Sequence, residues 1–99
     1  MQRKIRPARE SLFLALRKLF TQSARIIGLG WARVYAKQDL NSFTIHIPSE
    51  ERSVFLFRPR EEGKFVIFDD KSGELDNGEI KALYRRVVES VSKANRPPG

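Results

Sequence analysis

The residues best suited to chemistry in this chain are cations crowded into its first third. Residues 1–38 contain nine lysines and arginines and one acid, whereas residues 39–99 contain ten basic and eleven acidic residues. The formal charge of +7 therefore belongs to one segment. A local excess of Lys and Arg indicates a polyanionic partner, because these side chains neutralise phosphates. The nucleic-acid contacts predicted from this segment are Arg3, Lys4, Arg6, Arg9, Arg17, Lys18 and Arg25.

A second set of cations alternates with aromatic residues. The alternation follows the period of a β-strand and places four side chains on one strand face, Trp31, Arg33, Tyr35 and Lys37. Aromatic rings can stack on bases while cations hold the backbone of a single nucleic-acid strand. The strand face is therefore predicted as a second contact. The alternative is that both aromatic rings are buried and that the two cations extend from the edge.

Other groups in the sequence offer little for catalysis or metal binding. The absence of cysteine and the single histidine, His46, exclude a disulfide scaffold, zinc-finger spacing and a histidine-rich metal site. The acids of residues 69–79 do not form a calcium loop, because Leu75 stands where that loop needs glycine. We expect no cofactor and no metal, and a protein that binds rather than catalyses. A metal-independent ribonuclease that uses Arg33, Tyr35 and His46 is a further alternative.

These side chains depend on one small domain for their positions. A chain of 99 residues with 40% hydrophobic content builds a single core. The spacing of apolar residues predicts an amphipathic helix over residues 7–27, which Pro7 opens and Gly28 closes. A second amphipathic helix is predicted to follow Asp76, a good N-cap residue, and to reach Ala94.

Between the helices, alternating patterns and turn residues predict a sheet of four strands, over residues 31–37, 43–47, 53–58 and 64–69. Short polar connections between neighbouring strands favour hairpins. The expected fold is of the α+β class, a four-stranded antiparallel meander flanked by an N-terminal and a C-terminal amphipathic helix, in the order α-β-β-β-β-α. Residues 1–6 are expected to form a flexible basic arm, and residues 95–99 a flexible tail.

The last two predicted strands, SVFLFR and KFVIFD, are apolar on both faces. Such strands are normally covered on both sides of the sheet. If the helices cover opposite faces, nothing is left over. If they share one face, then either Phe55 and Phe57 or Val54 and Leu56 remain for another surface. The alternative function is therefore a protein-interaction module, a small inhibitor or assembly subunit, with a homodimer or a hetero-complex formed through the sheet.

The basic helix also suits partners other than nucleic acid. An amphipathic helix of this charge fits an acidic protein surface or an anionic membrane surface. The Arg-rich, acid-poor start is also compatible with an organelle-targeting peptide. The apolar stretch Leu12 to Leu16 is too short for a membrane span, so we expect no transmembrane segment. A soluble intracellular protein is favoured over a secreted one.

In its order of helix, strands and helix and in its basic charge, the chain resembles double-stranded-RNA-binding domains and the small RNA-binding subunits of signal recognition particles. The resemblance concerns topology alone, and this chain is predicted to have one strand more than those families. The start of its second helix, NGEIKALYRR, lacks the lysine cluster with which double-stranded-RNA-binding domains hold phosphates. No residue role is transferred from the resemblance, because a shared fold does not establish function.

Overall fold

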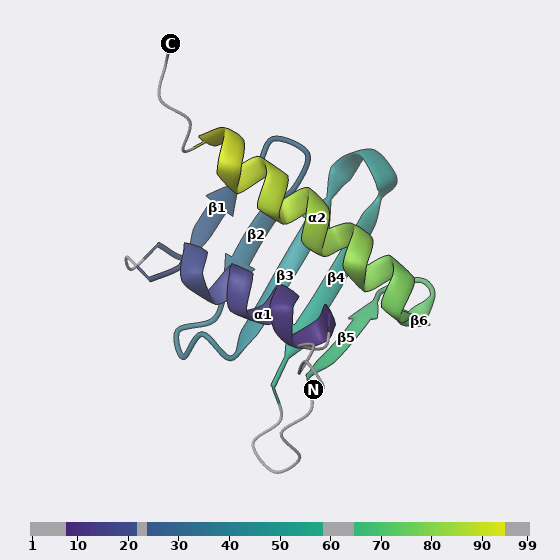
Figure 1. The fold of residues 1–99 in the computed structure, drawn as a ribbon. Helices are drawn as coiled ribbons and strands as arrows, with labels where there is room; N and C mark the ends of the chain where they lie inside the picture. The colour runs from purple at the N-terminus through teal and green to yellow at the C-terminus, as the bar shows by residue number, and fades with distance from the viewer. Residues whose placement is uncertain (1–7, 22–23, 59–64, 95–99) are drawn as a thin grey trace, which may run out of the picture.

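The computed structural model describes residues 8–21, 24–58 and 65–94 as two helices packed on an antiparallel sheet. The elements are α1 (Ala8–Leu19), β1 (Ile26–Gly28), β2 (Arg33–Ala36), β3 (Ser42–Ile47), a 3-10 turn (Pro48–Glu50), β4 (Arg52–Phe57), β5 (Val66–Asp69), β6 (Gly73–Glu74) and α2 (Asn77–Ala94). Each strand pairs with the next along the chain, so the sheet is a meander (Figure 1). The α+β class is confirmed. The predicted arm and tail, residues 1–6 and 95–99, lie outside the described residues.

The prediction of four strands is wrong, because the sheet has six. Strand β1 forms from the end of the predicted first helix, where Ile26 pairs with Tyr35 and Ile27 with Val34. The β-branched isoleucines fit a strand better than a helix. Helix α1 ends earlier, at Leu19, and a turn follows it. Strand β6 extends the sheet by a tight connection from β5.

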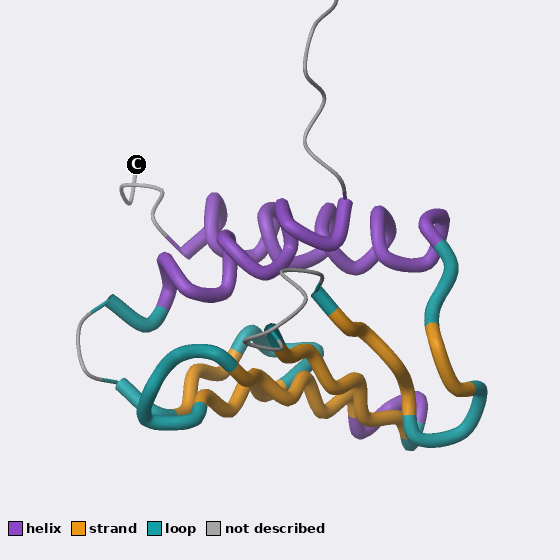
Figure 2. The backbone as a smooth tube through the Cα atoms, turned by 90° about the horizontal axis from the view of Figure 1, so that it is seen from below, coloured by secondary structure: helices purple, strands orange, loops and turns teal. Residues whose placement is uncertain are grey.

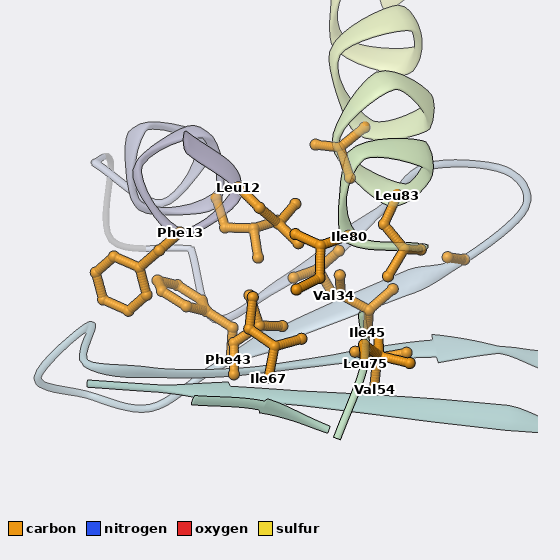
Figure 3. Packing of buried hydrophobic residues seen from close by; sticks show 14 of the residues in the cluster. Leu12, Phe13, Val34, Phe43, Ile45, Val54, Ile67, Leu75, Ile80 and Leu83 are labelled. Carbon is orange, nitrogen blue, oxygen red and sulfur yellow. The ribbon is translucent and has the colours of Figure 1, made fainter. Parts of the chain in front are cut away.

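Both helices lie on the same face of the sheet (Figure 2). They start near β5 and β6 and run side by side towards β1 (Figure 1). The apolar sides of the helices meet alternate residues of the central strands, as Figure 3 shows for ten labelled side chains, Leu12, Phe13, Val34, Phe43, Ile45, Val54, Ile67, Leu75, Ile80 and Leu83. Of the two arrangements that the sequence left open, the structure has the one in which the helices share a face. We call the face away from the helices the open face.

The start of α2 confirms the prediction from its cap. The Asp76 carboxylate accepts the Glu79 N–H at 2.8 Å, which satisfies one of the backbone donors left free at a helix start. Arg52 joins this first turn to the sheet. Its guanidinium lies 2.6 Å from the Asp69 carboxylate and 3.4 Å from that of Glu79. One arginine thus ties β4, β5 and α2 together.

Asp69 is the one polar residue in the buried set of the described chain, with 6% of its surface exposed. Its carboxylate accepts the backbone N–H groups of Ser72 and Lys71 and lies against Arg52. The Ser72 N–H, with further contributions from Lys71 and Arg52, lowers the pKa of Asp69 well below its ordinary value and outweighs the burial that raises it. The charged carboxylate therefore stabilises the turn from β5 to β6.

We predict that Asp69→Asn lowers the free energy of unfolding at neutral pH by about 1.5 to 3 kcal/mol, the range for hydrogen bonds to charged groups. Because the pKa of Asp69 is lower in the folded than in the unfolded chain, its stabilisation is complete above the unfolded value of about 4 and is lost as the pH falls below it. Urea unfolding between neutral and acidic pH should show a steeper loss for the wild type than for the variant. Parallel curves would contradict the assignment.

Candidate nucleic-acid interface

The cations of the described chain fall into a paired and an unpaired group. Arg9 lies 3.7 Å from Glu74, Arg86 lies 3.0 Å from Glu50, and Arg52 contacts three acids. Five of the predicted contact residues, in contrast, have exposed side chains without an acid within ion-pair distance among the described residues, namely Arg17, Lys18, Arg25, Arg33 and Lys37. Among the predicted contacts that the structure describes, Arg9 is therefore the one whose charge an acid balances.

Four of the unpaired cations belong to the last turn of α1, the residue before β1 and the residue after β2. We call Arg17, Lys18, Arg25 and Lys37 the basic end. The Ala36 N–H donates to the Arg25 carbonyl at 3.0 Å, which holds the chain before β1 against the end of β2. Arg25 and Lys37, twelve positions apart, thereby line one surface hollow. The turn that follows α1 lies alongside, because Phe20 and Thr21 line the same hollow.

The hollow at the basic end has a volume of about 330 Å³. Phe20 and Leu40 form apolar walls, and Thr21 and Gln38 add a hydroxyl and an amide beside the two cations. The nearby acid Asp39 serves the turn, since its carboxylate accepts the Asn41 N–H at 3.0 Å. Cationic and neutral hydrogen-bond donors around a hollow of this size suit a phosphate group. The sequence does not predict Thr21 and Gln38 as contact residues, because no local pattern links them.

The structure separates Trp31 from the cations with which it was predicted to share a strand face. The Trp31 indole N–H donates to the Ser90 hydroxyl of α2 at 2.7 Å, and the Arg86 guanidinium lies 4.0 Å from the ring centroid. Trp31 is therefore on the side of the helices, and its predicted place beside Arg33 and Tyr35 is wrong. The strand alternation begins only at Arg33, because Gly30, with a φ of 87°, makes a turn before it.

Arg33 and Tyr35 lie on the open face, as predicted for that pair. In the strand register, Arg33 pairs with His46 and His46 with Ser53, while Tyr35 pairs with Thr44. The His46 ring nitrogen Nδ1 lies 3.1 Å from the Ser53 hydroxyl. The three residues considered for a ribonuclease, Arg33, Tyr35 and His46, thus share one surface. Of the basic end, Lys37 is the nearest to them in sequence, because it directly follows the end of β2.

The remainder of the open face is apolar. The row that contains Tyr35 and Thr44 continues into Phe55 and Phe68, whose ring centroids are 5.3 Å apart. The next row pairs Ser42 with Phe57 and Phe57 with Val66. Phe57 is 37% exposed, and Ile26, on β1 beside Tyr35, is 59% exposed. Of the two sets that the sequence left open, Phe55 and Phe57 are the one that faces away from the helices.

Two further observations bound the chemistry of the described residues. Residues 8–21, 24–58 and 65–94 contain no group of three or more histidines and acids placed to hold a metal ion. No helix in that part of the chain has the length and the apolar character that a membrane span requires. The predicted contacts Arg3, Lys4 and Arg6 precede the described residues.

Comparison with protein-family models, with curated proteins and with solved structures gives no match to this chain. Its function is therefore inferred below from the arrangement of its own residues.

Because Trp31 is held between Ser90 and Arg86, we predict that its fluorescence reports folding rather than ligand contact. A single-stranded oligonucleotide should leave the emission of this one tryptophan unquenched, whereas urea should shift it as the chain unfolds. Ser90→Ala should lower the free energy of unfolding by about 1 kcal/mol, since the indole N–H loses its acceptor. Strong quenching by the oligonucleotide in the folded state would show that a base stacks on the ring.

Proposed function

We propose that the protein binds RNA or DNA through the phosphate backbone, with the basic end as the principal contact. The observation that carries the proposal is the meeting of Arg25 and Lys37 at one hollow without an acid partner among the described residues. Arg17 and Lys18 extend the same positive surface along the last turn of α1. Arg3, Lys4 and Arg6 would add phosphate contacts from the preceding segment.

The charge distribution favours a polyanion over a single small anion. Like charges held close together repel each other, and this cost is recovered when a ligand with repeated negative charges binds. At the opposite side of the molecule, Arg52 and Arg9 are neutralised by Asp69, Glu79 and Glu74. A nucleic-acid strand would therefore approach the β1 side of the molecule, where Arg25 and Lys37 line one hollow.

Contacts of this kind recognise the backbone rather than the sequence. The basic end offers point charges and the donors of Thr21 and Gln38, and the aromatic residues of the open face lie elsewhere. Lys and Arg contacts to phosphates fix position but read no bases. The proposed binding is therefore independent of sequence and sensitive to salt, because each phosphate contact releases counterions.

We predict that Arg25→Ala combined with Lys37→Ala weakens the binding of a fluorescent single-stranded oligonucleotide and flattens its salt dependence. Each phosphate contact contributes about 0.7 to the slope of log affinity against log salt for a single strand, so the slope should fall by about 1.4. Fluorescence anisotropy at several salt concentrations measures both quantities. The matched control is Lys81→Ala with Arg85→Ala, which removes the same charge from exposed positions of α2.

The proposal fails if the wild type does not bind at low salt, or if the two double variants lose the same affinity. Replacing Arg3, Lys4, Arg6 and Arg9 together measures the contribution of the preceding segment, to which Arg9 should add little because Glu74 already balances it. The RNA recovered after prolonged incubation should be intact. Cleavage that His46→Ala abolishes would instead identify the metal-independent ribonuclease.

A further inference from the structure

The open face has the composition of a protein contact rather than of a nucleic-acid surface. Its exposed and half-buried side chains include six large apolar residues, Ile26, Tyr35, Phe55, Phe57, Val66 and Phe68. Arg33 is the one cation within its paired strand rows, and Lys37 directly follows the end of β2. A polyanion needs several cations, whereas a contiguous apolar surface rimmed by polar residues is typical of protein association.

Two opposite charges lie at the ends of one row across this face. Arg33 on β2 begins the row, and His46 and Ser53 continue it on β3 and β4. Asp70 follows at the end of β5, where its N–H donates to the Ser53 carbonyl at 3.1 Å and its carboxylate accepts the Ser53 N–H at 3.2 Å. The row thus runs from a cation at β2 to an exposed acid beside β5.

We propose that two copies of this chain pack through their open faces, related by a twofold axis parallel to the strands. A half-turn about this axis exchanges the positions of β2 and β5 but leaves every row at its own level. Arg33 of each copy then meets Asp70 of the other, and the interface contains this ion pair twice. In the row below, Tyr35 faces Phe68 and Thr44 faces Phe55.

The charges select this axis over the other twofold arrangement of the same faces. A half-turn about an axis across the strands would lay β2 on β2 and reverse the order of the rows. Arg33 would then lie over the end of β2 that carries Lys37, where like charges repel. Sheets that pack face to face keep their strands aligned within about 30°. With the axis parallel to the strands, the strands of the two sheets are aligned, the apolar rows are in contact and Arg33 meets Asp70.

Sedimentation equilibrium over a wide range of protein concentration tests the proposal. The wild type should reach twice the 11.5 kDa mass of one chain. Phe57→Ser should raise the dissociation constant of the dimer by about tenfold or more, as truncation of an aromatic residue buried in an interface does. The matched control is Val88→Ser on α2, because Val88 is 38% exposed and Phe57 37%. This control should leave the dimer intact.

Charge reversal tests the axis itself. Arg33→Asp and Asp70→Arg should each weaken the dimer, and the chain that carries both changes should regain affinity because the ion pair is restored with its signs exchanged. Circular dichroism verifies that every variant is folded. A wild type that stays monomeric at all concentrations overturns the proposal, as does a dimer insensitive to Phe57→Ser. Failure of the double variant to recover overturns the axis.

The outcome is independent of nucleic-acid binding, because the dimer is tested at Arg33, Phe57 and Asp70, none of which belongs to the basic end. Arg25→Ala with Lys37→Ala should leave the dimer unchanged. A monomeric wild type in which an oligonucleotide protects Tyr35 and Phe55 from solvent would assign the open face to nucleic acid instead.

Discussion

The placement of both helices on one face of the sheet is the constraint on which the other surfaces of the molecule depend. Each helix has one apolar side. The apolar sides of α1 and α2 both pack on the inward residues of the sheet, such as Val34 and Ile45. Arg52 fixes this arrangement at one end by joining the first turn of α2 to β4 and β5. The opposite face consequently keeps its large side chains at the surface, and the ends of α1 and β2 meet at one corner.

The sequence predicts those parts of the fold whose signals are local. The cap at Asp76 and the alternation of β3 and β4 lie within a few residues, and the structure contains both. Ile26 and Ile27 fit the helical period equally well, so their pairing with Tyr35 and Val34 could not be read from their own segment. Arg25 and Lys37 were each identified as contacts, but their meeting depends on this same pairing.

The proposed self-association and the proposed nucleic-acid binding would use different parts of the surface. The basic end lies at the β1 side, whereas the proposed contact centres on β3 and β4. A pair of chains related by an axis along the strands would place its two basic ends at opposite sides of the assembly. One nucleic-acid molecule could then engage both ends, and the second contact would form at a high effective concentration. Weak phosphate contacts on each chain would in this way give stronger overall binding.

The outermost strands of the sheet are also its shortest, with three residues in β1 and two in β6. An edge strand has unpaired N–H and C=O groups that can pair with a strand of another molecule. Long edge strands therefore promote aggregation. Here each edge presents few such groups, although β4 and β5 contain the kind of aromatic and β-branched segments that form fibrils when exposed. The most aggregation-prone strands, β4 and β5, thus each have a neighbouring strand on both sides, so they are not available to extend the sheet with another molecule.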